Sequence, residues 1–404
     1  MVLEDLYLPF LNGKHLLIRS TLRDFASRRL IATDVMRRER EGDINGTVEV
    51  FRELAKLGYT GIRIPEDYGG MGEDIYSWII LMEELGYFDP NIAGMMLIHT
   101  GAASQCIVHF ASEDLKRKYL PLIARGERIL AFAMTEDEIP GSWSSYMKTK
   151  AEIKGDKYLL NGRKTFITNA GVADIFIVFA RLDPMEKGAR GIGMFIVEKN
   201  FPGFHFDGEI PGLGTRALSW GTITLEDCEV PRENLIVGPP KAFSLAMDMF
   251  NTERIGNPSI CNGIAQRAFD EALEFLIQRR DPRTSKSFLE SYQGLQFKIA
   301  EMASLIRSSR LNVWYCAYLI QNEKPYVKEV QLAKLFANEM VRRVCIDSMQ
   351  LQGGYGYSAE LLTEKLVRGG MFGGIGGGTL EILKLRYISE LMKEKGLKHH
   401  ETSK

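Results

Sequence analysis

The sequence predicts an α+β fold of three consecutive parts: a helical domain, a β-barrel or sandwich domain, and a helical bundle. Three observations carry this prediction. Residues 1–130 repeat apolar side chains at helical spacing, residues 131–240 hold short β-branched and aromatic runs between turn pairs, and residues 241–404 return to long helical periods. With 404 residues, the chain is long enough for two or three separately packed cores.

The N-terminal part is predicted to be helical from its apolar periodicity. Residues 46–59 and 73–88 repeat apolar side chains three and four positions apart, which is the spacing of one buried helix face. Residues 112–127 open on Ser112, a favoured N-cap residue, and acids follow in the first turn. We therefore expect a helical domain over residues 1–130.

The middle part reads as β structure. The stretch "KTKAEIKGDKYLLNGRKTFITNAG" places Gly-Asp and Asn-Gly pairs between short apolar runs, a pattern typical of hairpins. Strand-like runs continue to about Pro231, which gives an all-β domain of roughly 100 residues.

The C-terminal part contains four long segments of helical period. They cover residues 243–280, 288–321, 326–352 and 379–393. Four such segments joined by short connections predict a four-helix bundle.

Composition and charge narrow the function classes. Apolar residues make up 45% of the chain and charged residues 25%, and the net charge of −1 gives no support to a nucleic-acid partner. The five cysteines form no C-x-x-C pair, so we expect neither a disulfide framework nor a metal site. The first ten residues carry two acids and no long apolar run, and no stretch approaches the roughly 18 apolar residues of a membrane span. We expect a cytoplasmic protein without a membrane segment.

Five glycines stand within the twelve residues "MFGGIGGGTLEI" (371–382). Glycines of this density let the backbone approach a ligand closely. A dinucleotide-binding G-x-G-x-x-G loop requires a preceding strand and a βαβ unit, and here the glycines follow a helical bundle. A Rossmann site is therefore excluded.

Five strings, in this order, resemble signatures of the acyl-CoA dehydrogenase family of flavoproteins: "PEDYGGMG" (65–72), "AFAMTE" (131–136), "NGRKTFITNAGVADIFIVFAR" (161–181), "QLQGGYGY" (350–357) and "IGGGTLEI" (375–382). The resemblance spans nearly the whole chain. It implies FAD-dependent conversion of an acyl-CoA to trans-2-enoyl-CoA and transfer of electrons to an electron-transferring flavoprotein. It also implies a homotetramer whose FAD sites are shared between subunits. Two alternatives stay open: an oxidase or desulfinase on the same scaffold, and a non-catalytic acyl-CoA-binding member.

The residues of the strings 131–136 and 161–181 suit a flavin. Its ring needs flat apolar contact and hydrogen bonds at its polar edge. Phe166 can stack, and Thr168, two positions along a strand, presents its hydroxyl on the same face. Without the resemblance this pair reads as an ordinary half-buried hairpin. The resemblance implies cofactor contacts at Phe132, Met134, Thr135, Phe166, Ile167, Thr168, Gln350, Gly354, Thr379 and Glu381.

The chain departs from the family pattern in two loops. One extra residue precedes Gly141, and Trp143 stands where Asp is common, while Ser142 keeps the position that implies a contact with acyl-CoA. After the first bundle helix, "QRRDPRTSKSF" replaces the usual Arg followed shortly by Phe-Gly. Arg280 is the preferred stand-in for the arginine that reaches a partner's FAD, Arg283 is the alternative, and either can equally be a solvated charge at a helix end.

The catalytic base is also displaced. Most family members carry it two residues before the Thr of the last signature, and here that position is Gly377. Glu253 beside Arg254 occupies the place used by isovaleryl-CoA and long-chain acyl-CoA dehydrogenases, so the resemblance implies Glu253 as the base. The backbone N–H of Gly377 can still donate to the thioester oxygen, and Arg254 and Gly378 are assigned to the substrate. The alternative for Glu253 is a solvated helix acid that pairs with a nearby base.

Overall fold

The computed structural model describes residues 11–182, 186 and 188–397. The predicted order of a helical part, a sheet and a second helical part is confirmed. The acidic N-terminal segment 1–10, which contributed to the expectation of a cytoplasmic protein, lies outside the described residues. The chain packs as two compact units, which we call the sheet unit (Arg38–Asp74 and Asn91–Glu253) and the bundle unit (the chain up to Arg37, Ile75–Pro90, and the chain from Arg254 onward).

The helical elements of the sheet unit pack against strands of its sheet. Ser112 caps α7, because its hydroxyl accepts from the Leu115 N–H at 3.4 Å, as its place in the sequence predicted. The predicted helix 46–59 is α3, which ends at Lys56. The helical elements are α3 (Ile44–Lys56), η2 (Tyr59–Gly61), η3 (Glu66–Tyr68), α5 (Pro90–Ile98), η4 (His99–Ala103), α6 (Ser104–Phe110), α7 (Glu113–Ala124), η5 (Gly141–Tyr146), η6 (Gly188–Gly191), η7 (Arg232–Asn234) and α8 (Ala242–Glu253), with α2 (Ala32–Glu41) crossing the unit boundary.

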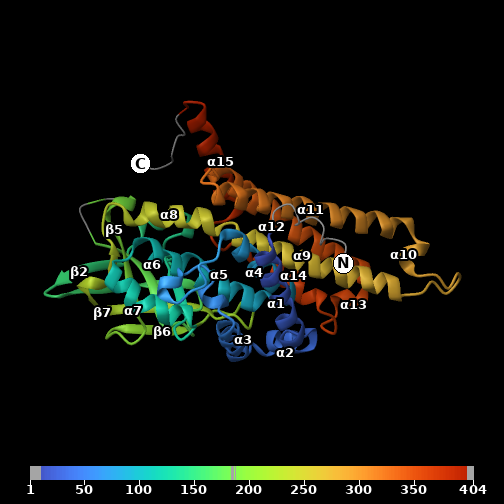
Figure 1. The fold of residues 1–404 in the computed structure, drawn as a ribbon, viewed down its shortest axis with the longest axis horizontal. Helices are drawn as coiled ribbons and strands as arrows, with labels where there is room; N and C mark the ends of the chain where they lie inside the picture. Colours follow the sequence, from blue (N-terminus) through green and yellow to red (C-terminus); the bar gives the residue numbers. More distant parts are fainter. Residues whose placement is uncertain (1–10, 183–185, 187, 398–404) are drawn as a thin grey trace. The chain divides into compact units, whose positions relative to one another are not determined.

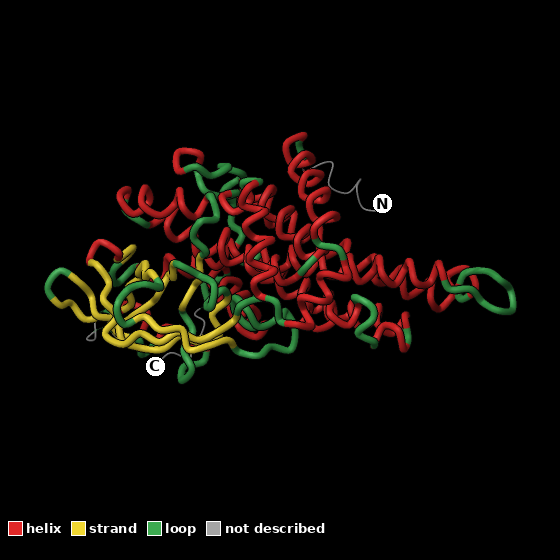
Figure 2. Tube along the Cα trace, turned by 90° about the horizontal axis from the view of Figure 1, so that it is seen from below, coloured by secondary structure: helices red, strands yellow, loops and turns green. Residues whose placement is uncertain are grey.

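One mixed sheet forms the centre of the sheet unit (Figure 2). The strand order is β6-β7-β3-β2-β4-β5-β8, and β1 pairs in parallel with β4. The strands are β1 (Leu130–Ala133), β2 (Lys150–Lys154), β3 (Lys157–Thr168), β4 (Ile175–Arg181), β5 (Ile192–Glu198), β6 (Phe204–Glu209), β7 (Trp220–Pro231) and β8 (Leu235–Val237). Strands β4 and β5 are buried along almost their whole length and form the core with apolar residues of α6 and α7.

The two predicted turn pairs have different outcomes. The Gly-Asp pair is the turn between β2 and β3, where Gly155 has φ +62°. The Asn161-Gly162 pair is not a turn, because it lies inside β3 at a shift of register against β7. A Cβ at Gly162 would lie 2.4 Å from the Thr149 Oγ1. The missing side chain at Gly162 therefore lets β3 approach the residue that precedes β2 closely.

The bundle unit is built around α9, α11 and α12, which run side by side in Figure 1. Helix α9 also packs closely on α4: a Cβ at Gly263 would lie 2.1 Å from the carbonyl oxygen of Glu83. The helices are α1 (Gly13–Arg29), α4 (Ile75–Phe88), α9 (Gly256–Gln278), α10 (Phe288–Ser291), α11 (Gln293–Gln321), α12 (Val327–Gln352), α13 (Gly354–Tyr357), α14 (Thr363–Phe372) and α15 (Leu380–Glu394).

Two predictions for the C-terminal part need correction. The segment 243–280 was expected to be one helix, and it is two, α8 and α9, separated at Arg254 and Ile255. Helix α14 was not predicted, because its two glycines, Gly369 and Gly370, weaken the helical signal. Among the described residues, no helix is both long and apolar enough to span a bilayer.

A buried ion pair joins α14 to the end of α4. Lys365 Nζ lies 2.9 Å from Asp89 Oδ1, and both side chains are almost fully buried. We predict that Lys365→Met lowers the free energy of unfolding by about 3–5 kcal/mol, because it removes one partner of a buried ion pair.

The matched control is Lys328→Met, which breaks the partly exposed pair between Lys328 and Glu394 at 2.6 Å. Its effect should stay within about 1 kcal/mol. Denaturant unfolding of both variants measures the difference, and equal effects would contradict the role given to Asp89 and Lys365.

Candidate active site

Glu253 is the last residue of α8 and its carboxylate is buried, with 7% of the residue exposed. Its Oε1 lies 2.9 Å from Nη1 of Arg63, whose own side chain is also largely buried. Burial raises the pKa of Glu253 to about 7, while Arg63 and the backbone of Ala102 oppose that rise by favouring the ionised form. The alternative considered from the sequence, a solvated helix acid paired with a nearby base, is therefore right about the pairing, which Arg63 provides, and wrong about the solvent, because the carboxylate is buried.

The backbone next to Glu253 is shaped around the carboxylate. η4 is a single π-helical turn, and Gly101 within it has φ −97° and ψ −123°, outside the helical region. A Cβ built on Gly101 would lie 1.8 Å from Oε2 of Glu253, so the acid fills the space that any side chain at this position would need. Isolated π-turns are frequent at functional sites. Neither Arg63 nor Gly101 was identified from the sequence, since each becomes relevant only through its approach to Glu253.

Phe166 presents an exposed aromatic ring on the sheet unit. The ring is 51% exposed and stacks on Trp220, with centroids 5.1 Å apart and an angle of 27°. The residue has φ +59°, at a shift of register between β3 and β7. A non-glycine residue in this region stores strain of about 1–3 kcal/mol, which is commonest at ligand sites. Ile167 is buried and Thr168 is half-buried. The exposed ring of Phe166 fits a flat heteroaromatic ligand, and the shared face expected for Phe166 and Thr168 stays a prediction.

The segment after β1 is fixed by a buried lysine. Lys164 Nζ donates to the carbonyl of Met134 at 3.1 Å and to Glu136 at 2.9 Å, and the Thr165 N–H donates to the carbonyl of Thr135 at 3.0 Å. Burial lowers the pKa of Lys164 to about 8, opposed by the charge of Glu136. This arrangement aligns the backbone of 134–136 with β3 and was not foreseen from the sequence.

Phe132 and Ser142, both predicted to contact ligands, lie in different surroundings. The half-buried Phe132 ring packs against the core at 5.1 Å from Phe179 and 4.9 Å from Phe250. Ser142 lies in η5, but its side chain is outside the described part of the structure. Trp143 beside it is 53% exposed and lies 5.6 Å from the Tyr146 ring. The assignment of Ser142 to the substrate stays a prediction.

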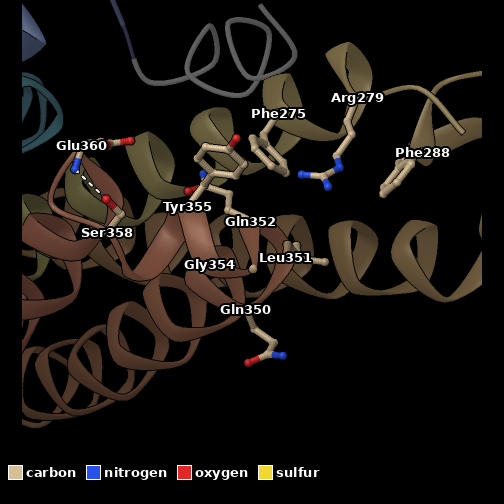
Figure 3. A pocket seen from close by; sticks show the side chains of 11 residues that line it. Phe275, Arg279, Phe288, Gln350, Leu351, Gln352, Gly354, Tyr355, Ser358 and Glu360 are labelled. Carbon is tan, nitrogen blue, oxygen red and sulfur yellow. Dashed lines mark hydrogen bonds between the residues drawn. The ribbon is translucent and has the colours of Figure 1, made fainter. Parts of the chain in front are cut away.

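The bundle unit holds a cavity of about 510 Å³ at the end of α12. Gln350 and Gly354, both predicted to serve FAD, are among the residues that line it. Figure 3 shows Arg279 between two aromatic rings: its guanidinium lies 5.6 Å from the centre of Phe275 and 5.2 Å from that of Phe288. The cavity therefore pairs a cation with flat apolar surfaces.

The arginine in this cavity is Arg279, which the sequence comparison had not chosen. Arg280 is exposed, and its backbone forms the bridge to Ser287. Arg283 is bound to Asp281 at 2.9 Å and to the Tyr292 hydroxyl at 2.8 Å. The residues between Arg279 and Phe288 form a loop whose ends meet, because the Phe288 N–H donates to the Arg279 carbonyl at 2.8 Å. The loop thus brings an Arg and a Phe together although nine positions separate them in the sequence.

The glycine-rich segment is held by a cation on α12 and by a second cation in the turn between α8 and α9. Lys334, fully buried on α12, donates to the carbonyls of Gly376 and Gly378, the latter at 3.0 Å. Arg254 Nε donates to the carbonyl of Gly377 at 3.4 Å. Burial, with the charge of Arg254 adding to it, lowers the pKa of Lys334 to about 7.

The glycines of this segment are required by conformation and by space. Gly377 and Gly378 have φ +68° and +101°. A Cβ at Gly374 would lie 2.1 Å from the Arg342 guanidinium. Thr379 stands at the N-cap of α15, and Glu381 lies exposed in its first turn. The assignments of Gly377, Gly378, Thr379 and Glu381 to ligands stay predictions.

Three models of the acyl-CoA dehydrogenase family match the chain in succession. The N-terminal domain model matches residues 12–127, the middle domain model residues 131–228, and the C-terminal domain model residues 242–392. The order agrees with the three parts predicted from the sequence.

Individual relatives agree with the family models. The short-chain specific acyl-CoA dehydrogenase of Clostridium acetobutylicum is 37% identical over 371 residues, which cover 91% of this chain and 95% of that protein. A subunit of the caffeyl-CoA reductase–Etf complex of Acetobacterium woodii is 33% identical over 95% of this chain and 100% of its own. The structure of butyryl-CoA dehydrogenase from Megasphaera elsdenii superposes with a TM-score of 0.90 at 32% identity, over 95% of this chain and 99% of that one.

The chain therefore belongs to the acyl-CoA dehydrogenase family of oxidoreductases, which confirms the resemblance found in the sequence. A further structure, an acyl-CoA dehydrogenase from Bacillus anthracis, was solved in complex with FAD. It superposes with a TM-score of 0.88 at 28% identity, over 96% of this chain and 68% of that one. FAD is accordingly the cofactor, and the exposed Phe166 with Thr168 beside it suits its ring.

The two arginines give a direct test of the cavity at the end of α12. We predict that Arg279→Gln reduces the affinity for FAD about tenfold or more, because a charge-assisted hydrogen bond to a phosphate contributes about 1.5–3 kcal/mol. Arg280→Gln is the matched control and should retain FAD. The FAD-to-protein ratio after gel filtration measures both, and loss of FAD from Arg280→Gln alone would restore the assignment made from the sequence.

Proposed function

We propose that this protein oxidises an acyl-CoA thioester to trans-2-enoyl-CoA with Glu253 as the base. The observation that carries the proposal is the burial of the Glu253 carboxylate with a pKa of about 7, in a chain that has glycine at 377. A base works best when its pKa lies near the working pH, since it is then both ionised and able to hold a proton.

In the proposed reaction the ionised Glu253 takes the proton from the α-carbon of the substrate. The bound FAD supplies the acceptor for the hydride from the β-carbon. The carbon–carbon double bond forms as these two C–H bonds break, and the proton stays on Glu253 until product release. Phe166, Thr168 and the backbone of 134–136 would hold the cofactor on the sheet unit, while the N–H of Gly377 would stabilise charge on the thioester oxygen.

The electron acceptor and the substrate are proposed from the relatives. An electron-transferring flavoprotein is supported by the Acetobacterium relative, which is a subunit of a complex with such a protein. A short acyl chain is supported by the Clostridium and Megasphaera enzymes, whose names state short-chain and butyryl-CoA substrates. We also propose a cytoplasmic homotetramer, in which Gln350, Gly354 and Arg279 serve the FAD of a neighbouring subunit. Light scattering that finds a monomer with full FAD would contradict this assembly.

A second function, reduction of an enoyl-CoA, is favoured by one observation. The Acetobacterium relative is part of a caffeyl-CoA reductase, at 33% identity over its full length. The same residues would serve in this direction, with Glu253 returning a proton to the α-carbon. Steady-state turnover separates the two directions: butyryl-CoA consumed with an oxidised electron acceptor supports oxidation, while crotonyl-CoA consumed with a reduced electron donor, without turnover in the first assay, supports reduction.

The base assignment is tested by Glu253→Gln. The variant keeps the size of the side chain and should still bind FAD and acyl-CoA, but flavin reduction should slow at least about a hundredfold, because general-base catalysis contributes that much. Stopped-flow bleaching with a panel of straight, branched and aromatic acyl-CoAs measures the rate. Reduction at the parent rate would show that Glu253 is not the base, and the oxidase, desulfinase or non-catalytic alternatives would then be tested by oxygen reactivity, sulfite release and acyl-CoA binding.

Moving the carboxylate probes the same assignment. We predict that Gly377→Glu combined with Glu253→Gly regains only part of the activity. Residue 377 has φ +68°, and its Cβ would lie 3.3 Å from Lys334 Nζ, so the new acid is strained and drawn toward a cation. Stopped-flow rates above those of Glu253→Gly support the exchange, and full recovery would contradict the constraint on residue 377.

The pH dependence follows from the pKa of about 7. The proposed base must be ionised to accept a proton, so kcat/KM for acyl-CoA oxidation should rise as the pH increases through about 7 and then level off. Steady-state rates between pH 5.5 and about 8.5 measure this limb. A flat profile, or a rate that falls over this range, would be inconsistent with Glu253 as the base.

A further inference from the structure

Arg63 is the cation that faces the proposed base within the sheet unit. It stands between η2 and η3, two residues before Pro65, and reaches Glu253 across 190 positions of sequence with a 2.9 Å contact. The two side chains are 11% and 8% exposed, so water screens their attraction only weakly. An ion pair of this kind acts on the charge state of its carboxylate far more than a surface pair does.

Among the described groups that act on the charge state of Glu253, Arg63 carries the opposite charge. From η4, Glu253 meets Gly101 and the backbone of Ala102, neither of which carries a titratable side chain. From α6 it meets Cys106, a buried thiol whose pKa is raised by that burial and by Glu253, so it stays neutral. His109, further along α6, lies near Arg63, and burial lowers its pKa, with Arg63 adding to the effect.

Arg63 is itself held in place. The Gln105 side chain donates to the Arg63 carbonyl at 3.4 Å, and the flanking Ile62 and Ile64 are buried. The guanidinium therefore approaches Glu253 from a fixed backbone. Its contact with Oε1 leaves Oε2 directed at the space over Gly101, where a side chain is absent.

We propose that Arg63 is a positioning residue for the reaction: it aims the Glu253 carboxylate and keeps it ionised inside the protein until the substrate proton arrives. This inference rests on the proposed role of Glu253 as base. The arrangement has an opposing effect on basicity, because transfer of a proton to Glu253 removes the negative partner of a buried guanidinium. Arg63 thus sets the pH above which the base is available and moderates its strength.

The variant Arg63→Met separates these effects. It keeps a long apolar side chain and removes the charge, so Glu253 should become protonated at neutral pH. An opposite charge within about 4–6 Å lowers the pKa of a carboxyl group by about 1–3 units, so the rising limb of kcat/KM should move to higher pH by that amount. Arg63→Lys keeps the charge and should restore most of the parent profile. The matched control is Arg125→Met, which removes the arginine of an exposed pair with Glu127 at 2.6 Å and should leave the profile unchanged.

A second measurement needs no turnover. Infrared difference spectra of the FAD-bound protein, titrated without substrate, follow the carboxylic-acid carbonyl band that Glu253→Gln abolishes. In Arg63→Met this band should persist to a higher pH than in the parent, because the protonated form of Glu253 is then lost at a higher pH. FAD content and the melting midpoint verify that each variant is folded.

The outcomes distinguish this inference from the function on which it rests. An unmoved infrared titration in a folded Arg63→Met protein overturns the role of Arg63, even if Glu253→Gln proves inactive. A moved titration together with a moved limb of kcat/KM supports it. A moved titration with parent activity in Glu253→Gln overturns the proposed base, and with it the catalytic meaning of the pair.

Discussion

The balance between burial and charge at Glu253 is the constraint around which the sheet unit is arranged. A carboxylate taken out of water requires compensation, and here it comes from Arg63 and the backbone of Ala102. The compensation is incomplete, which leaves the pKa near 7 and not at the ordinary value of an exposed acid. The π-turn at Gly101 serves the same end, since a regular helix with a side chain there would exclude the carboxylate.

The glycine-rich segment of the bundle unit depends on side chains far from it in the sequence. In the bundle unit, Lys334 and Arg254 bind the carbonyls of residues 376–378 and so fix peptide groups that have no side chains to anchor them. Positive φ values at Gly377 and Gly378 make this geometry specific to glycine. The segment is therefore ordered by side chains from elsewhere in the bundle unit, and its glycines with positive φ are structural requirements.

The surface proposed for FAD also depends on buried polar groups. Lys164 is fully buried and donates hydrogen bonds to Met134 and Glu136. These bonds hold the segment after β1 against strand β3. The shift of register in β3 turns Phe166 outward onto Trp220. The positive φ of Phe166 and the burial of Lys164 each cost stability at the surface proposed for FAD, and the packing of the surrounding sheet offsets that cost.

The order of the helical and sheet parts, most helix positions and the family could be predicted from the sequence, because periodicity and local motifs act over short stretches. The break of the helix after Glu253, the bulge at Asn161-Gly162 and the place of Arg279 in the cavity could not, since a bulge or a longer loop changes spacing without leaving a local signal. Arg63, Gly101 and Lys334 were likewise decided by the tertiary structure. Their roles come from the approach of side chains far apart in sequence, and one sequence without its packing does not record which charge faces which.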